Sequence, residues 1–153
     1  MASRELDETD AAILDLLGEN ARRTLADVSW HVNLSASAVR RRIERLEETR
    51  VITGYTVTVD HAKVGRPVHA FTEVRFSAAG DLTGFQAATA GSPEVEAVYA
   101  TAGDLDALVR LRAADIDRLG RVVEGLRQSG WVAGTKTLVV LKTWTRRSSA
   151  HVC

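Results

Sequence analysis

The sequence predicts an α+β protein in which a helical N-terminal part precedes a ferredoxin-like β-α-β-β-α-β module. Up to residue 48, apolar residues recur at helical spacing behind residues that can cap helices. After residues 65–67, the pattern changes to short alternating strands separated by two helical segments. With 153 residues and 45% hydrophobic content, the chain can support two small domains, each with a core.

The first predicted helix begins after Asp7, which is a residue type that caps helices. Its apolar residues are Leu6, Ile13, Leu14 and Leu17, and they repeat at helical spacing. This helix is expected to supply the core that two short helices cannot build alone.

A second, short helix is predicted over residues 25–32. Thr24 followed three residues later by Asp27 fits a capping box. Asn33 tolerates left-handed backbone geometry, and Ser35 can cap a third helix. Two helices separated by so short a turn must cross steeply, as they do in a helix-turn-helix motif.

The third predicted helix combines an apolar stripe of Val39, Ile43 and Leu46 with a cationic outer face. Small residues at the start of such a helix let it enter a DNA major groove, and guanidinium groups reach guanine edges or phosphates. The alternative is a solvated face whose arginines are balanced by nearby glutamates. At about 100° per residue, the outward arc holds Ser37, Arg40, Arg41, Glu44 and Arg45, with Arg42 on its flank.

Net charge limits how this helix can attract DNA. Lys plus Arg equals Asp plus Glu at 20 each, and residues 1–60 hold 8 basic and 11 acidic residues, a net of −3. Attraction must therefore be local. Most of the acidic residues are expected on the first helix, away from the groove face. We expect weak, salt-sensitive non-specific binding that needs more than one copy per site.

The remaining elements define the second domain. Residues 51–60 are rich in β-branched residues and are predicted to form a strand. Both helices of the module should cover one sheet face, so its open apolar face is a predicted dimerisation surface. Further strands are predicted at 68–76, 95–101, 106–112 and 132–144, and helices at 81–90 and from 116 to 126 behind Asp115. The predicted boundaries are 1–60 for the helix-turn-helix domain, 61–67 for a hinge, 68–145 for the ferredoxin-like domain and 146–153 for a flexible tail.

Six motifs occur at fixed spacings along the chain. They are L-D-x-x-D-x-x-I-L at 6–14, N-A-R-x-T-x-x-D-V at 20–28, L-S-x-S-A-V-x-R-R-I-x-R-L-E at 34–47, V-I-T-G-Y at 51–55, G-D-L-D at 103–106 and T-K-T-L-V-V-L at 135–141. Together they resemble the Lrp/AsnC (leucine-responsive, feast/famine) family of transcriptional regulators. The resemblance implies a helix-turn-helix (winged-helix-like) DNA-binding domain and a C-terminal module that dimerises and binds an amino-acid effector between dimers. It also implies dimers that assemble into octamers and wrap double-stranded DNA.

Several residues depart from the family pattern. Asn33 and Arg50 stand where the family usually has Gly, and Arg50 is predicted to add a phosphate contact at the end of the third helix. Leu105 stands where an aromatic residue is common, and Trp131 where smaller residues are usual. The candidate DNA-binding residues are Thr24, Ser35, Ser37, Arg40, Arg41, Arg42, Arg45 and Arg50.

A candidate effector pocket surrounds the G-D-L-D motif. Asp104 and Asp106 can receive an α-ammonium group, and Thr101 with Gly103 can hold a carboxylate. The alternative is that Gly103 and Asp104 only form a β-turn. Large apolar residues here would favour an apolar or aromatic amino acid. The candidate effector-binding residues are Thr101, Gly103, Asp104, Leu105, Asp106, Trp131, Thr135 and Thr137.

Catalytic and metal-binding functions are not predicted. The four histidines, at 31, 61, 69 and 151, lack metal-ligand spacing, and Cys153 is a lone thiol. No phosphate-binding loop, nucleophile elbow, signal peptide or membrane-spanning run is present, so we expect a cytoplasmic protein that is not an enzyme and has no cofactor. The alternative function is a non-catalytic small-molecule-binding or assembly protein whose helical domain contacts protein. A regulatory subunit of an amino-acid enzyme would leave the arginine-rich helix unexplained.

Overall fold

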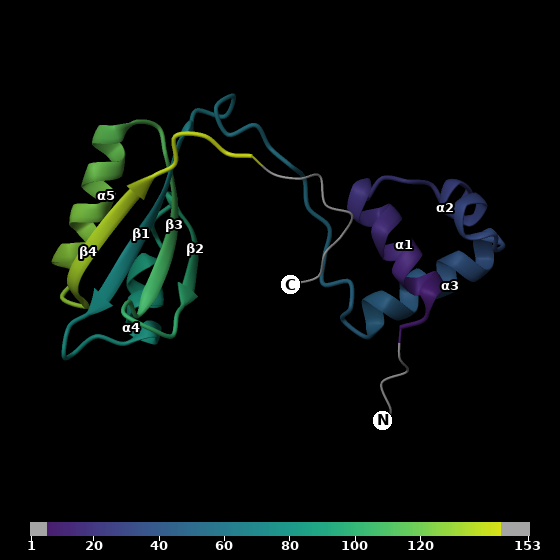
Figure 1. Cartoon of the computed structure of the whole chain (residues 1–153), viewed down its shortest axis with the longest axis horizontal. Coiled ribbons are helices and arrows are strands. Elements are labelled where there is room, and N and C mark those ends of the chain that lie inside the picture. The colour runs from purple at the N-terminus through teal and green to yellow at the C-terminus, as the bar shows by residue number, and fades with distance from the viewer. Residues whose placement is uncertain (1–5, 145–153) are drawn as a thin grey trace. The chain divides into compact units, whose positions relative to one another are not determined.

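A computed structural model describes residues 6–144, which divide into two compact units, one up to Val57 and the other covering Thr58–Thr143 (Figure 1). The predicted tail at 146–153 lies outside the described residues. No helix within the described part of the chain has the length and apolar character needed to cross a membrane.

Three helices form the first unit: α1 (Glu8–Glu19), α2 (Leu25–Val32) and α3 (Ala36–Glu48). All three predicted helices are therefore confirmed. Each helix places at least one fully buried aliphatic side chain in a shared core, because none of these short amphipathic helices can bury its apolar face alone. The core residues are Ile13 from α1, Val28 from α2, and Val39 and Leu46 from α3.

Caps set where these helices begin. Asp7 and Asp10 form a reciprocal capping box at α1, in which the Asp10 backbone N–H donates to Asp7 Oδ1 at 2.8 Å. Thr24 Oγ1 accepts from the Asp27 backbone N–H at 3.1 Å, but the Asp27 carboxylate pairs with Arg23 at 2.6 Å. The capping box predicted for α2 is thus formed only on its Thr24 side.

The turn between α2 and α3 has the predicted geometry. Asn33 adopts φ 51°, in the left-handed region, and Ser35 Oγ accepts from the Ala38 backbone N–H at 3.2 Å. A residue that tolerates this conformation suits this position, because only residues 33–35 separate α2 from α3.

Arg50 also adopts the left-handed conformation, with φ 59°. It follows the last residues of α3, and its backbone N–H donates to the Glu47 carbonyl at 3.0 Å while the Ile52 N–H donates to the Leu46 carbonyl at 2.9 Å. The helix therefore ends as it would with a glycine, although a side chain at this position costs about 1 kcal/mol.

The strand predicted at 51–60 is wrong, because these residues form no helix or strand in the described structure. Alternation and β-branching favour an extended backbone, but a strand also needs a partner for its hydrogen bonds. The exposed large apolar residues here include Tyr55, Val57 and Val59.

The second unit has the predicted ferredoxin-like order of elements. They are β1 (Val68–Phe76), α4 (Leu82–Thr89), β2 (Val95–Ala100), β3 (Ala107–Ala113), α5 (Ile116–Gln128) and β4 (Val132–Val139). The four strands lie antiparallel in the order β2-β3-β1-β4. The last strand ends at Val139, five residues before the predicted end at Trp144.

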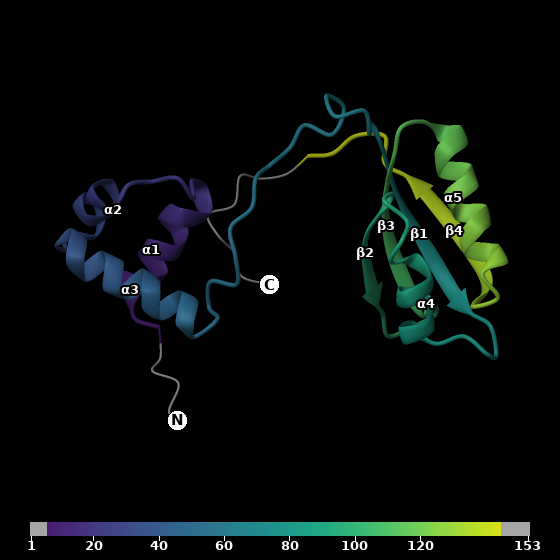
Figure 2. The same ribbon diagram turned by 180° about the vertical axis from the view of Figure 1, so that it is seen from behind.

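Both helices cover the same face of this sheet (Figures 1 and 2). Phe85 of α4 and Leu119 and Val123 of α5 join Val74 and Leu111 of the sheet in one buried cluster. The side chains that alternate with this core lie on the open face, where Phe71 pairs across strands with Leu138 and Arg110. The predicted open, partly apolar sheet face is therefore present in the described unit.

Candidate nucleic-acid interface

The exposed face of α3 begins directly after its Ser35 cap. Ser37, Arg40 and Arg41 are all exposed, and the two arginines have no ion-pair partner among residues 6–144. Ser37 Oγ lies 3.0 Å from Ser35 Oγ, so the first turn of the helix is small and polar. A small first turn followed by unpaired guanidinium groups suits entry into a major groove.

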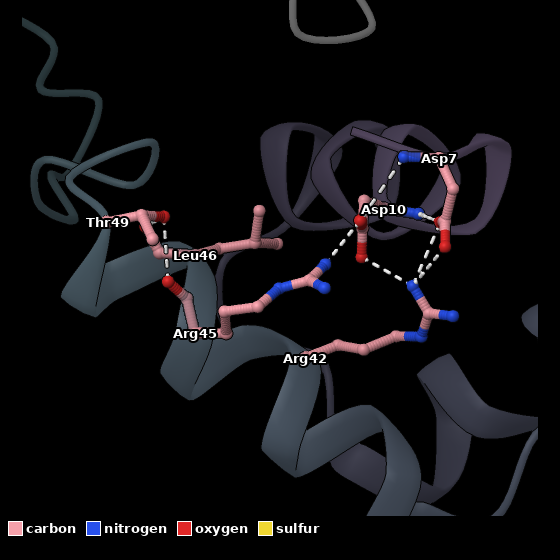
Figure 3. A network of polar contacts seen from close by, with 6 residues as sticks. All are labelled: Asp7, Asp10, Arg42, Arg45, Leu46 and Thr49. Atoms are coloured by element: carbon pink, nitrogen blue, oxygen red, sulfur yellow. Dashed lines mark hydrogen bonds and ion pairs between the residues drawn. The ribbon is translucent and has the colours of Figure 1, made fainter. Parts of the chain in front are cut away.

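Arg42 and Arg45 lie on the flank of α3 that faces α1, and both reach carboxylates there (Figure 3). Arg42 Nη1 donates to Asp10 Oδ1 at 2.7 Å and to Asp7 Oδ2 at 2.8 Å. Arg45 Nη2 donates to the second oxygen of Asp10. We refer to these four residues as the Asp7/Asp10 clamp.

Burial makes the clamp different from an ordinary surface ion pair. The Asp10 side chain is only 1% exposed, whereas those of Arg42 and Arg45 are 27% and 34% exposed. A buried carboxylate needs a paired cation, because an isolated charge loses its hydration. The hydrogen bond that Arg42 donates to Asp7 lowers the pKa of Asp7, and the same bond raises the pKa of Arg42.

Two sequence-based expectations are corrected by this geometry. The acidic residues of α1 do not all lie away from α3, because Asp7 and Asp10 bind its arginines. Arg45 is not a free outward residue, since it is half-buried against Asp10. Helical angles alone put Arg45 on the outer arc, but they contain no information on which helix packs beside it.

A shallow cavity of about 470 Å³ lies along the C-terminal half of α3. Its lining contains three arginines and three carboxylates, so its formal charge is zero (3 − 3). Arg41 is itself one of the three arginines of this charge-balanced lining, whereas Arg40 is not among the lining residues. The residues lining the cavity are Asp7, Arg41, Arg42, Glu44, Arg45 and Glu48.

The remaining candidate DNA-binding residues lie at helix ends. Thr24 and Ser35 are the N-caps of α2 and α3, where unpaired backbone N–H groups favour a phosphate. Arg50 follows the C-cap of α3 and is exposed. Helix N-termini and an exposed guanidinium suit phosphate contacts, whereas sequence readout needs side chains that reach base edges.

A second cavity, of about 300 Å³, lies in the ferredoxin-like unit beside the ends of β1 and β4. It brings together opposite charges, with Lys136 Nζ 3.7 Å from Glu73 Oε1. Three of the predicted effector-binding residues, Asp104, Leu105 and Thr135, line it. The other lining residues are Glu73, Arg75, Gly134 and Lys136.

Two predicted effector residues are engaged within the chain itself. Asp106 Oδ2 accepts from the Phe76 backbone N–H at 2.7 Å, beside the irregularity in β1 where the register with β4 shifts. Thr101 Oγ1 donates to the Leu105 carbonyl at 2.6 Å. Gly103, with φ 139°, lies in the bend between them. These contacts hold the loop together, as the turn interpretation of the G-D-L-D motif expects.

Two more predicted effector residues lie on the opposite, core-facing side of the sheet. The Trp131 ring packs on Gly84 of α4, where an added Cβ would lie 2.6 Å from ring atoms. Thr137 Oγ1 is 3.0 Å from the hydroxyl of buried Thr72. The structure therefore does not bring Trp131 and Leu105 together in this cavity, because Leu105 lines it whereas Trp131 packs on α4 and the core cluster.

Sequence reasoning missed three charged residues of this cavity: Glu73, Arg75 and Lys136. Glu73 and Lys136 are register partners in the β1–β4 pair. Opposite charges at such paired positions attract, but the register between strands so distant in sequence is not written in either strand alone. Within residues 6–144, no group of three or more His, Cys, Asp or Glu side chains could hold a metal ion.

Comparison with protein families assigns both units. Residues 6–47 match the AsnC-type helix-turn-helix domain, and residues 69–150 match the Lrp/AsnC ligand binding domain. The chain is 35% identical to the HTH-type transcriptional regulator Rv2324 of Mycobacterium tuberculosis, over 89% of this chain and 92% of that protein.

Solved structures agree with this assignment over almost the whole chain. A crystal structure of the transcriptional regulator NMB0573 from Neisseria meningitidis, in complex with L-Met, matches with a TM-score of 0.89 at 30% identity, covering 96% of this chain and 97% of that one. The structure of E. coli AsnC matches with a TM-score of 0.85 at 26% identity, covering 94% and 97% of the two chains.

Proposed function

The chain belongs to the Lrp/AsnC family of transcriptional regulators, and we propose that the exposed face of its α3 helix reads DNA sequence. The observation that carries this proposal is the pair Arg40 and Arg41, exposed and unpaired within residues 6–144, directly after the small first turn at Ser37. Guanidinium groups there can bind guanine edges in the major groove or the adjacent phosphates.

Contacts to the DNA backbone complete this interface. Thr24 and Ser35 would place the N-termini of α2 and α3 at phosphates, and Arg50 would add a cation near the end of α3. Arg42 and Arg45 would act mainly by fixing α3 against α1, because each is already bound to Asp10. Of the four arginines on α3, Arg40 and Arg41 would thus bind DNA, and Arg42 and Arg45 would position the helix.

The test removes the exposed cations and leaves the clamp. The double variant Arg40→Met/Arg41→Met should lose binding to the DNA upstream of its own gene in a mobility-shift titration. Methionine keeps the helical propensity and the apolar stem of arginine. Light scattering should give the same assembly as the wild type. Unchanged DNA affinity would contradict the proposal and favour an assembly protein whose helical unit contacts protein.

We further propose that the cavity beside β1 and β4 receives an amino-acid effector. The α-carboxylate would face Lys136 and Arg75, and the α-ammonium group would face Glu73 and Asp104. The solved relative bound to L-Met supports an amino acid as the class of ligand. Leu105 would contact its side chain, which favours an apolar amino acid.

A thermal-shift screen of the twenty amino acids tests this assignment. A ligand raises the midpoint of unfolding only if it binds the folded state. Glu73→Gln should remove the shift given by the best amino acid, whereas Glu124→Gln, an exposed change on α5, should leave it unchanged. A shift that survives in Glu73→Gln would place the effector elsewhere.

We also propose a homodimer, formed through the open sheet face, as the unit that assembles to an octamer. Phe71, Leu138 and Tyr99 lie on that face, and both ring nitrogens of His69 are buried without a hydrogen-bond partner in residues 6–144. Two linked DNA-binding units would multiply weak half-site affinities. A monomer in light scattering at micromolar concentration would contradict this.

A further inference from the structure

We propose that Asp7 and Asp10 are specificity-determining positioning residues, which neutralise Arg42 and Arg45 and so limit attraction to DNA of any sequence. This inference rests on the proposed function of α3. It assigns a role to two carboxylates that the DNA-reading face does not include.

The first step is geometric. Asp10 is fully buried under α3 and binds one arginine with each carboxylate oxygen. Asp7 caps α1 and accepts from Arg42 with both oxygens, at 2.9 and 2.8 Å. Arg42 is thereby held between two carboxylates of α1, and its guanidinium is not free to follow a DNA phosphate (Figure 3).

The second step is electrostatic. The Asp7/Asp10 clamp has two guanidinium and two carboxylate groups, so its formal charge is zero (2 − 2). Without Asp7 the same site would have a formal charge of +1, beside Arg41 and at the mouth of the 470 Å³ cavity. Four unneutralised arginines within two turns of one helix would form a strong, sequence-independent phosphate site.

The third step concerns specificity. Non-specific affinity rises with the number of phosphates that a protein neutralises, whereas base contacts determine the difference between sites. A regulator that must choose among sites benefits from a low affinity for random DNA. The ratio of specific to non-specific affinity determines how fully its target site is occupied. The clamp keeps Arg42 and Arg45 as helix-positioning groups and leaves sequence recognition to Arg40 and Arg41.

Asp7→Asn is the variant that separates charge from folding. Asparagine caps helices as well as aspartate does, and its oxygen can still accept from the Asp10 N–H. Arg42 also keeps its bond to Asp10. The matched control is Asp15→Asn, because Asp15 is an exposed acid of the same helix with no ion-pair partner within residues 6–144.

The experiment measures binding of the full chain to a fluorescent random-sequence duplex by anisotropy, over a series of NaCl concentrations. For Asp7→Asn we expect non-specific affinity to rise roughly fivefold at 0.1 M salt. The slope of log affinity against log salt should steepen by about 0.9 for each bound protomer. Discrimination between upstream DNA and random DNA should fall by a similar factor. Asp15→Asn should behave as the wild type.

Two outcomes would overturn the inference while leaving the proposed function intact: equal behaviour of Asp7→Asn and Asp15→Asn, or a gain that raises specific and random affinity together without loss of discrimination. If the wild-type chain binds neither upstream DNA nor random DNA, the proposed function is overturned instead. Circular dichroism spectra of both variants should match that of the wild type. A change in DNA affinity can then be assigned to the lost charge and not to a change in folding.

Discussion

Two flanks of helix α3 have the same residue type in different surroundings. Arg40 and Arg41 are exposed and unpaired among residues 6–144, whereas Arg42 and Arg45 bind the carboxylate of buried Asp10. The four side chains belong to two successive turns of one helix. Their environments differ because α1 packs along one flank and places an acid there.

The number of arginines in a sequence cluster therefore does not show how many guanidinium groups are available to bind DNA. A helix that reads DNA must also be held at a fixed angle by its own domain, and here the same residue type serves both needs. The exposed pair is expected to control affinity, and the clamped pair is expected to control stability. Each of the following changes tests that division.

Removal of Asp10 should give the largest effect. Asp10→Ala removes the two hydrogen bonds between charged groups that Asp10 accepts from Arg42 and Arg45, and should lower the free energy of unfolding by about 3 kcal/mol. Urea unfolding followed by far-ultraviolet circular dichroism measures this loss. Asp15→Ala, an exposed change in the same helix, should stay within about 0.5 kcal/mol of the wild type. Equal losses would contradict a special role for the clamp.

A bulky residue on the exposed face should affect binding instead of stability. Ser37→Tyr fills the small first turn of α3 and should weaken specific DNA binding by about 2 kcal/mol, since the helix can no longer enter the groove. Anisotropy with upstream DNA measures the loss. Ala11→Tyr, on an exposed position of α1, is the control. If Ser37→Tyr binds as well as the control, another surface reads the DNA.

A smaller effect is expected at the end of α3, where the backbone conformation of Arg50, and no carboxylate, fixes its position. Arg50→Gly should raise the free energy of unfolding by about 1 kcal/mol, since glycine adopts φ 59° without strain. Arg50→Ala removes the guanidinium but keeps the strained conformation. DNA affinity that falls equally in both variants would assign the loss to a phosphate contact, and affinity that falls only in Arg50→Gly would contradict that contact.

The smallest effect concerns pH. Its bond to Arg42 lowers the pKa of Asp7 from the ordinary value of 3.8, so folding gains stability from this group at pH values above its unfolded pKa. That gain is lost as the pH falls through the folded pKa. The thermal midpoint of the wild type should therefore exceed that of Asp7→Asn at pH 6, and the difference should shrink as the pH falls below 3.8. A constant difference across this range would exclude the ionised Asp7–Arg42 pair as the cause.

Local features of the fold could be predicted from the sequence. The predicted caps Asp7, Thr24, Ser35 and Asp115 begin helices as their residue types suggest. The change from helical to alternating periodicity located the ferredoxin-like unit, because period and turn residues act within a few positions. The segment at 51–60 was misjudged for the opposite reason, since strand formation depends on a distant partner.

The sites were predicted less completely because they depend on contacts between elements. Asp10 lies 32 residues before Arg42 in the chain, and only the packing of α1 on α3 brings them together. The family resemblance places Trp131 near the effector pocket, but its ring packs on Gly84 of α4 and against the core cluster. Lys136 and Glu73 meet through a register that no local pattern defines.

The central claim is that Arg41 binds DNA whereas Arg42 does not. The most direct test compares the salt dependence of DNA binding in two double variants, each of which loses one arginine and one carboxylate. Arg41→Met/Asp15→Asn removes an exposed arginine, and Asp7→Asn/Arg42→Met removes a clamped one. Each also removes one carboxylate of α1 or its cap. The account predicts that the slope of log affinity against log salt falls by about 0.9 per bound protomer in the first variant and stays unchanged in the second. An equal fall in both, or a fall only in the second, would contradict it.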